Sequence, residues 1–430
     1  MIVGSGGRED AIVRNLVSYG HSVYSCIGIA NPSIIRNSAE YVEVQETDWK
    51  SIHARSLAWR PDLAVVSPDS ALDTPLVDSL TLSGIPVASP SSKAAEIETS
   101  KQFMRSIMAK YSIEGNLWNQ TYTDSESLRS GISGMRNEFV VKPIGLTGGK
   151  GVRVMGEHFP DAESGIKLAE EILGKDGRVL IEEKVTGEEF SLQVFCDGTD
   201  IVAMPLAQDY KRAYEGNTGP NTGGMGSITD SDHLLPFVSA AQKDKAMGIL
   251  RRIVSALSME GRPFTGIMYG QFMASRNGVK VIEINARFAD PEGINVINLL
   301  DEDLGEIFMK LVNGNVETGI RFKNRATVLK YVVPPGYGSN PRQTDLIISP
   351  AEKADSAELY YASVTGTLDK VKTSKSRALA IIAQADSIPE ASRKVDESLK
   401  RISGEFAIRR DIGSAEMIRR KVASLNNPAS

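Results

Sequence analysis

The residues best suited to chemistry are glycines and lysines that lie between two apolar, strand-like runs. The segment Gly145–Gly151 reads GLTGGKG, and Lys142 precedes it by three positions. Glycines let backbone N–H groups converge on phosphate oxygens, and lysine ammonium groups neutralise the phosphate charge. Strand-like runs flank the segment on both sides, which predicts a hairpin that folds over phosphates. A P-loop is excluded because Lys150 is not followed by Ser or Thr. The alternative is a tight surface hairpin without a ligand.

A second candidate segment passes from an apolar strand into an acidic turn at 179–190, VLIEEKVTGEEF. An adenine ring needs an apolar slot with polar backbone groups at its edge, and a ribose needs a carboxylate for its hydroxyls. Residues Glu183–Val185, followed by Glu188 or Glu189, can supply these groups. The alternative is a solvated turn at the end of a strand.

A third segment, VIEINARF at 281–288, has the residue types of a metal site. Because side chains alternate along a strand, Glu283 and Asn285 share one face. A carboxylate and an amide oxygen suit Mg²⁺, which also keeps waters and nucleotide phosphates in its shell. Across a hairpin turn predicted at Asn277–Gly278, Gln271 is expected on the paired strand as a third oxygen donor. The alternative is a polar strand face turned to solvent.

Two further features are suited to anionic substrates. Arg287 follows on the same strand face and can contact a carboxylate or phosphate in bidentate fashion. The segment 209–226, DYKRAYEGNTGPNTGGMG, is so dense in glycine that we expect neither an ordinary helix nor an ordinary strand. It is therefore either a mobile linker or a binding loop with exposed backbone donors. The charges of Asp209, Lys211 and Arg212 favour the binding loop.

The segment GSGGRE at 4–9 lies at a predicted strand–helix turn, where an anion can rest on the N–H groups of the helix N-terminus. No acidic residue closes the second strand, as a dinucleotide ribose would require, so we expect a small phosphorylated or carboxylated substrate. The four histidines, at 21, 53, 158 and 233, lie outside these motifs. A histidine-based acid/base or nucleophilic mechanism therefore has no support.

Length and composition limit the number of domains and the class of protein further. The 430 residues predict about three domains. With 49 basic and 54 acidic side chains, the net charge of −5 argues against a nucleic-acid partner. No apolar run approaches the roughly 18 residues of a membrane span, and glycines and charges follow residue 3 too soon for a signal peptide. Cys26 and Cys196 have no metal-site spacing. We expect a cytoplasmic α/β protein without a membrane partner.

Four blocks of elements must position these motifs. Strand–helix–strand alternation over 1–95 predicts a parallel sheet with helices. A helix-forming stretch at 93–111 leads to strand-like runs around the glycine segment. A third block, from 191 to a helix near 301–313, alternates as expected of an antiparallel sheet with a hairpin. A final block with its own strands begins at 325 and ends in a polar tail.

Taken in order, these segments resemble the phosphoribosylamine–glycine ligase (glycinamide ribonucleotide synthetase) family of ATP-grasp enzymes. The resemblance runs nearly end to end and is carried by GSGGRE, PSSKAAEIETSKQFM, KPIGLTGGKGV, EEKVTGEEFS, DYKRAYEGNTGPNTGGMGS, INARFADPE and RRDIG. It implies an α/β, ATP-grasp fold with an N-terminal parallel-sheet domain (1–95), an ATP-grasp domain (96–320, with a lid subdomain at about 116–185) and a small α+β C-terminal domain (321–430).

The implied reaction is ATP-dependent ligation of glycine to 5-phosphoribosylamine in purine biosynthesis. It gives glycinamide ribonucleotide, ADP and phosphate by way of a glycyl phosphate. The implied partners are therefore these small molecules, and we expect a monomer or a weak homodimer. The alternative is another ATP-grasp carboxylate–amine ligase with a different carboxylate or amine. A non-catalytic nucleotide-binding regulator is disfavoured because Glu283, Asn285 and both loop lysines are retained.

The resemblance also implies roles for individual residues. ATP would be bound by Lys101, Lys142, Gly148, Gly149, Lys150, Gly151, Glu182, Glu183, Val185 and Glu189. Mg²⁺ or Mn²⁺ would be held by Glu283, Asn285 and Gln271. Catalysis would involve Asp209, Lys211 and Arg287. The other substrates would contact Gly6, Gly7, Arg8, Glu9, Pro220, Asn221, Thr222, Gly223, Gly224 and Asp290.

Several positions depart from the family pattern, among them Gly293-Ile294, where Thr-Gln is common. Asp10 replaces the usual histidine of GREHA, Ala289 replaces the glycine of NARFGDPE, and Pro143 lies in KPIG where KADG is more usual. These departures concern substrate contacts and leave the expected reaction class unchanged.

Overall fold

The computed structural model describes residues 1–426 apart from 134, 136–137, 146–150, 276–277 and 352–356. The N-terminal segment forms the parallel sheet that the sequence predicted, in the order β3-β2-β1-β4. Its strands are β1 (Ile2–Val3), β2 (Tyr24–Ile27), β3 (Glu40–Glu43) and β4 (Val65–Val66). Its helices are α1 (Gly7–Ser18), α2 (Pro32–Asn37), α3 (Trp49–Trp59), α4 (Asp69–Leu72) and α5 (Leu76–Leu82). Buried apolar residues of β1 and β4 form its centre.

The helix expected at 93–111 is two helices, α6 (Ser92–Thr99) and α7 (Lys101–Lys110). The break lies at Ser100, which has extended backbone and whose hydroxyl accepts the N–H of Phe103 at 3.2 Å. A serine at this position favours a helix start because its side chain satisfies a backbone donor that the first turn leaves unpaired. The new start places Lys101 in the first turn of α7.

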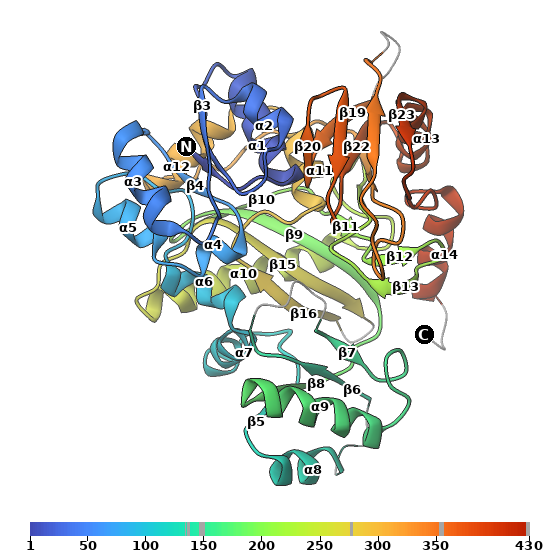
Figure 1. Cartoon of the computed structure of the whole chain (residues 1–430). Helices are drawn as coiled ribbons and strands as arrows, with labels where there is room; N and C mark the ends of the chain where they lie inside the picture. Colours follow the sequence, from blue (N-terminus) through green and yellow to red (C-terminus); the bar gives the residue numbers. More distant parts are fainter. Residues whose placement is uncertain (134, 136–137, 146–150, 276–277, 352–356, 427–430) are drawn as a thin grey trace.

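A four-stranded sheet with two helices projects from the rest of the molecule (Figure 1). Its order is β5-β8-β6-β7, from β5 (Asn119–Tyr122), β6 (Phe139–Lys142), β7 (Arg153–Val154) and β8 (Val179–Glu183), with α8 (Ser125–Ser133) and α9 (Ala162–Asp176). Residues such as Leu128 and Phe139 give it a hydrophobic core of its own. β6 and β7 pair antiparallel, so strands flank the glycine segment as predicted.

The third block is the predicted antiparallel sheet, in the order β10-β9-β15-β16. Its strands are β9 (Glu188–Asp197), β10 (Ile201–Ala203), β15 (Thr265–Ser275) and β16 (Gly278–Asn285). Gln271 pairs with Glu283, which confirms the predicted register, and the pairing is irregular between Gln271 and Phe272. Asn277, half of the predicted turn, lies outside the described residues.

Helices pack around this sheet. α10 (Ala240–Met259) contacts β15 and β16, and α12 (Leu304–Val312) contacts β15 and β9. α11 (Glu292–Leu299) is buried along its whole length and also contacts α1. Among the residues that the structure describes, no helix has the length and apolar character to cross a membrane.

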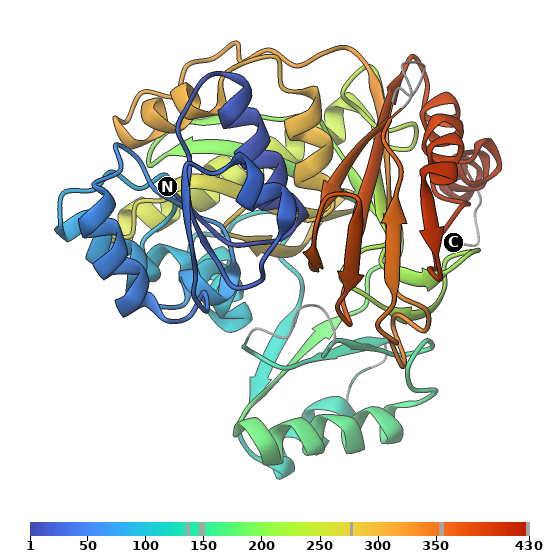
Figure 2. The same cartoon turned by 45° about the horizontal axis from the view of Figure 1, so that its top comes forward.

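The C-terminal strands complete a sheet that begins in the preceding block. Its order is β11-β14-β17-β22-β19, from β11 (Gln208–Asp209), β14 (Gly226–Thr229), β17 (Ala326–Val332), β22 (Leu379–Ala385) and β19 (Ala357–Tyr361). A second sheet, β20-β21-β18-β23, joins β20 (Val364–Gly366), β21 (Lys370–Thr373), β18 (Asp345–Ile348) and β23 (Ile402–Gly404). Helices α13 (Ile388–Ser398) and α14 (Ala415–Asn426) lie beside the C-terminal strands, on the side that faces away from the N-terminal sheet (Figure 2).

The expectation that 209–226 contains no ordinary strand is wrong. Its middle forms a two-stranded hairpin, β12 (Arg212–Tyr214) with β13 (Thr218–Asn221). The turn between them is possible because Gly216 (φ 71°) and Asn217 (φ 60°) both adopt left-handed conformations, which glycine and asparagine tolerate best.

Candidate active site

A cleft of about 870 Å³ opens where the projecting sheet faces β15 and β16. It brings together most of the residues that the sequence singled out: Arg8, Lys101, Lys142, Glu182, Glu183, Val185, Glu189, Asp209, Lys211, Asn221, Thr222, Gly223, Gln271, Glu283, Asn285, Arg287 and Asp290. Apolar side chains, including Met104, Leu117, Val140, Val152 and Ile282, line part of its wall. An apolar wall with converging charged groups is the usual form of a small-molecule site.

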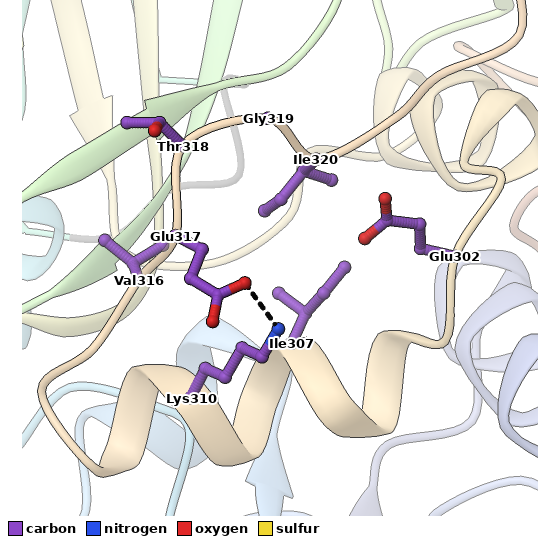
Figure 3. A pocket seen from close by; sticks show the side chains of 8 residues that line it. All are labelled: Glu302, Ile307, Lys310, Val316, Glu317, Thr318, Gly319 and Ile320. Atoms are coloured by element: carbon purple, nitrogen blue, oxygen red, sulfur yellow. Dashed lines mark hydrogen bonds and ion pairs between the residues drawn. The ribbon is translucent and has the colours of Figure 1, made fainter.

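A second, much smaller pocket of about 70 Å³ lies beside α12 (Figure 3). Its charged groups are already paired, because Lys310 Nζ lies 2.9 Å from Glu317 Oε2, and Glu302 Oε1 lies 3.3 Å from Arg321 Nε. None of the sequence motifs reaches it. The large cleft is therefore the candidate active site.

Some predicted residues do not line the cleft. Gly6, Gly7, Glu9, Gly151, Pro220 and Gly224 lie outside its lining, whereas Gly148, Gly149 and Lys150 lie outside the described residues. The anion site expected at the N-terminus of α1 is occupied by the chain itself. Glu9 Oε2 accepts the N–H of Gly6 at 2.7 Å, and Glu9 Oε1 accepts from Arg8 Nε at 2.7 Å. A carboxylate three residues into a helix commonly satisfies such a donor.

Lys142 reaches the cleft from β6 and is held by a buried ion-pair network. Its Nζ lies 2.6 Å from Glu182 Oε2, and Arg105 Nε donates to Glu182 Oε1 at 2.7 Å. The side chains of Arg105 and Glu182 are each 1% exposed. Burial alone would raise the pKa of Glu182, but Arg105 and Lys142 outweigh it and lower that pKa to about 2. Glu182 is thus an anion that orients two cations.

Lys101 joins the start of α7 to the start of the glycine segment. Its Nζ donates to the carbonyl oxygen of Gly145 at 2.8 Å, and its backbone N–H donates to Ile144 O at 3.2 Å. Burial lowers the pKa of Lys101, and the neighbouring Lys142 lowers it further, against the effect of Glu283. Two ammonium groups thus share one wall of the cleft, which is a favourable environment for a polyanion.

The predicted metal corner has suitable oxygen donors on β16. Asn285 Nδ2 donates to Glu283 Oε1 at 3.4 Å, so the carboxylate and the amide lie together. Burial favours protonation of Glu283, but Lys211, Lys142 and Lys101 together lower its pKa and keep it ionised. No three acidic, histidine or cysteine side chains among the described residues group closely enough to hold a metal alone. The set therefore fits Mg²⁺ that also binds phosphate oxygens.

The side-chain amide of Gln271 is already hydrogen-bonded to other side chains of the cleft. Its Oε1 accepts from Lys211 Nζ at 2.7 Å and from Tyr269 Oη at 3.2 Å, while its Nε2 donates to Glu189. The amide oxygen is thus available to a metal only after Lys211 releases it. Register placed Gln271 correctly, but the competing lysine comes from a distant loop that the hairpin pattern does not reveal.

Lys211 lies at the centre of an acidic group. Burial disfavours its charge, but Glu189, Glu283 and Asp209 outweigh burial and raise its pKa. Conversely, burial and the neighbouring Glu292 raise the pKa of Asp209 well above its usual value. Asp209 Oδ1 is buried and has no hydrogen-bond partner among the described groups. The corner therefore holds more carboxylate than it neutralises internally, which suits a cationic amine.

Arg287 is anchored by a residue that sequence reasoning missed. Its Nη2 lies 2.9 Å from Oε1 of Glu98, whose Oε2 accepts the N–H of Ala286 at 2.7 Å. Glu98 comes from α6 and is 7% exposed. Burial raises its pKa, an effect that Arg287 opposes. The guanidinium therefore faces the cleft in a fixed orientation.

Other cleft residues were also missed: Asp69, Tyr269, Glu292, Arg377 and Lys421. The pattern FADPE carried a signal for Glu292, because it follows the metal strand directly. Arg377 and Lys421 lie in segments without a glycine loop or an acidic pair, so no local signal marks them.

Comparison with protein families gives three matches that together cover most of the chain. Residues 1–98 match the phosphoribosylglycinamide synthetase N domain, residues 99–293 its ATP-grasp (A) domain, and residues 327–415 its C domain. A phosphoribosylamine–glycine ligase of Thermococcus kodakarensis is 41% identical over 98% of this chain and 97% of its own length. One from Methanoregula boonei is 42% identical over 99% of both.

Solved structures have the same architecture. The crystal structure of phosphoribosylamine–glycine ligase from Thermotoga maritima gives a TM-score of 0.81 at 26% identity, over 96% of this chain and 99% of that one. The biotin carboxylase domain of 2-oxoglutarate carboxylase from Hydrogenobacter thermophilus gives 0.73 at 13% identity, over 99% and 94%. The latter likeness concerns the fold alone.

Proposed function

The chain belongs to the phosphoribosylglycinamide synthetase (phosphoribosylamine–glycine ligase) family, and from this membership we propose how its residues carry out the reaction. The protein is an ATP-dependent ligase that joins glycine to 5-phosphoribosylamine in purine biosynthesis. The observation that supports this assignment best is one cleft that contains Lys101, Lys142, an ionised Glu283 and a fixed Arg287. We propose that its three parts end near residues 95 and 320, and that it works in the cytoplasm as a monomer or weak homodimer.

Lys101 and Lys142 neutralise the ATP phosphates in this proposal. Glu182 holds Lys142 through an ion pair of 2.6 Å, so the ammonium is oriented before the nucleotide arrives. The apolar wall beside Glu183–Val185 takes the adenine, and Glu189 takes the ribose hydroxyls. Phosphoryl transfer depends chiefly on positioning and charge neutralisation, which these groups provide. Gly148–Gly151 remain predicted to cover the phosphates.

Glu283 and Asn285 hold the divalent metal. Mg²⁺ or Mn²⁺, when bound, neutralises charge on the transferring phosphoryl group. Gln271 would be available as a further oxygen donor only without its hydrogen bond from Lys211. These residues contribute one formal negative charge, from Glu283, which suits a metal that would also be bound by nucleotide phosphates.

Arg287 orients the carboxylate of glycine towards the terminal phosphate. A carboxylate oxygen of glycine attacks the γ-phosphorus and displaces ADP, which gives a glycyl phosphate. The amine nitrogen of phosphoribosylamine then attacks the acyl carbon, displaces phosphate and releases a proton. Two anions must approach closely in the first step, so a fixed guanidinium lowers the activation free energy of that step. Asp209, with its unpartnered buried oxygen, receives an amine proton or an ammonium group. Arg8 and the segment 221–223, which line the cleft, enclose the ribosylamine, and Glu9 orients Arg8.

The test is substrate-dependent formation of product. We expect ADP and glycinamide ribonucleotide in equal amounts when ATP, glycine and 5-phosphoribosylamine are all present. Replacing glycine with formate or bicarbonate distinguishes this reaction from those of other ATP-grasp ligases. ADP release that is independent of glycine would contradict the assignment.

A further inference from the structure

We propose that Arg377 is a positioning residue that fixes the substrate-binding segment 223–224 and Asp290 in one arrangement. The proposal rests on the proposed function and deepens it. Arg377 lies between β21 and β22, in the C-terminal part of the chain, and its side chain lines the cleft. It is 16% exposed, so most of the guanidinium is enclosed by protein.

The guanidinium of Arg377 contacts two segments that come from elsewhere in the chain. Its Nη1 donates to the carbonyl oxygens of Gly223 and Gly224, and to Asp290 O at 3.0 Å. Its Nη2 lies 3.1 Å from Asp290 Oδ2. One side chain therefore joins the segment after the β12–β13 hairpin to the segment after β16.

Tyr331 of β17 completes this arrangement. Its hydroxyl donates to Asp290 Oδ1 at 2.6 Å, so both carboxylate oxygens of Asp290 are bound by C-terminal residues. The ring of Tyr331 lies 4.5 Å from Cζ of Arg377, which places the cation over an aromatic face. A Cβ at Gly7 would lie 2.8 Å from the Tyr331 hydroxyl, so the start of α1 also packs against this arrangement.

These contacts indicate why an arginine is needed. Its planar fork binds several carbonyl oxygens and one carboxylate together, whereas lysine is a point charge on a flexible stem. Without the fork, Gly223, Gly224 and Asp290 lose their shared partner while the hydrophobic core is unchanged. The ATP-binding lysines come from α7 and β6. The loss should therefore affect the amino-acid and ribosylamine subsites, and leave the nucleotide subsite intact.

The experiment compares Arg377→Lys and Arg377→Ala with the same changes at Arg14. Arg14 is a matched control, because it also binds a backbone carbonyl and a carboxylate across the interface with the C-terminal part. Its Nη1 donates to Leu359 O at 2.9 Å, and its Nη2 lies 2.9 Å from Glu358 Oε2. It also lies over the Tyr360 ring at 4.2 Å, but does not line the cleft.

For each folded variant, kcat and the KM values for ATP, glycine and phosphoribosylamine are measured beside the Tm. Misplacement of a substrate by about 1 Å can cost about 10²-fold in rate. We therefore expect the Arg377 variants to lose at least about tenfold in kcat/KM for glycine and phosphoribosylamine, with the KM for ATP within about twofold of wild type. The Arg14 variants should lower Tm without this difference between ATP and the other two substrates.

Two results would overturn the inference. One is an Arg377→Lys enzyme with wild-type kcat/KM for glycine. The other is a loss that affects ATP equally, or that the Arg14 variants reproduce at the same Tm, which would make Arg377 a general stabiliser. Failure of the wild-type protein to form glycinamide ribonucleotide would instead reject the proposed function, so the two failures are distinct.

Discussion

The ammonium of Lys142 lies 2.6 Å from Glu182 Oε2, inside the wall of the cleft. Arg105 binds the same carboxylate through both Nε and Nη2, at 2.7 and 3.2 Å. Glu182 therefore forms ion pairs with two cations, neither of which is well hydrated. Removal of one member of a buried network is costly because it leaves the others uncompensated.

Glu182→Gln should destabilise the protein by roughly 3–5 kcal/mol, because Arg105 and Lys142 lose their shared anion. The measurement is Tm, with Glu170→Gln as the control. Glu170 makes a similar two-point pair with Arg129, but that arginine side chain is 56% exposed, so loss of the pair should lower Tm much less than Glu182→Gln does. Equal effects of the two substitutions would contradict the burial argument.

The ion pairs of Glu182 also predict that the stability of the protein depends on pH in the acidic range. The folded-state pKa of Glu182 is lowered to about 2 from an ordinary 4.5, so its stabilisation is complete above about pH 4.5. It should be lost as pH falls from about 4.5 towards 2. The wild-type Tm should approach that of Glu182→Gln over this range. A constant difference between the two proteins over this range would contradict the lowered pKa of Glu182 in the folded state.

Glu283→Gln should reduce ligation by at least about 10²-fold, because the metal corner loses its anionic ligand while the shape of the strand is kept. Binding of Mn²⁺ in the presence of ATP, followed by electron paramagnetic resonance, provides a readout besides turnover. Glu358→Gln on β19 is the control, since that glutamate does not line the cleft. Unchanged turnover and unchanged Mn²⁺ binding in Glu283→Gln would reject the metal assignment.

Gly224→Ala should impair use of glycine much more than binding of ATP. A Cβ there would lie 2.6 Å from both Asp209 Oδ1 and Pro291 Cδ, and Gly224 has φ of 102°. Gly216→Ala is the matched control, because it also has positive φ (71°) but would meet no atom closer than 4.0 Å. The left-handed backbone costs about 1–2 kcal/mol in Gly216→Ala, and the penalty at Gly224 is at least as large because its φ lies further from the left-handed minimum. Equal kcat/KM for glycine in the two variants would contradict a steric effect at Asp209.

Asp10 predicts an opposite dependence on pH. It is fully buried, accepting Ser33 Oγ at 2.6 Å and the N–H of Tyr361 at 2.8 Å. Burial raises its pKa from 3.8 to about 6, so the folded state holds this proton more tightly than the unfolded state. Stability should therefore fall by up to roughly 3 kcal/mol between about pH 4 and pH 6, and change no further above that.

Asp10→Asn isolates this contribution. An amide can keep both contacts, accepting from Tyr361 and donating to Ser33, without gaining a charge at higher pH. The Tm of wild type relative to Asp10→Asn should thus fall between pH 4 and 6. A wild-type advantage that grows over this range would contradict the raised pKa. Asp10 lies on α1, joins it to Ser33 of α2 and Tyr361 of β19, and is not part of the cleft lining, so its departure from the family pattern concerns stability.

Features that depend on short-range periodicity could be predicted from the sequence. The pairing of Gln271 with Glu283 follows from strand alternation and one hairpin turn. The parallel N-terminal sheet follows from the alternation of strands and helices. Resemblance to a known family added the identity of the substrates, which no periodicity contains.

Features that join distant segments could not be predicted. Glu182 and Arg105 are 77 positions apart, and Arg377 and Asp290 are 87 apart, so only the folded chain brings them together. The sequence also does not reveal which side chains compete for the same hydrogen-bond partners. Gln271 has the expected neighbour, yet its oxygen is bound by Lys211, and the N-terminus of α1 is filled by Glu9.

The pairing of β14 with β17 has a practical consequence for dissecting this enzyme. Gly226–Thr229 align with Thr327–Lys330 in one antiparallel ladder, so a cut near residue 320 divides a continuous sheet. A fragment ending there would present the backbone of β14 as an open edge, which invites self-association. The two pieces should therefore be produced together, as complementary halves that reassemble, if the contribution of each is to be measured.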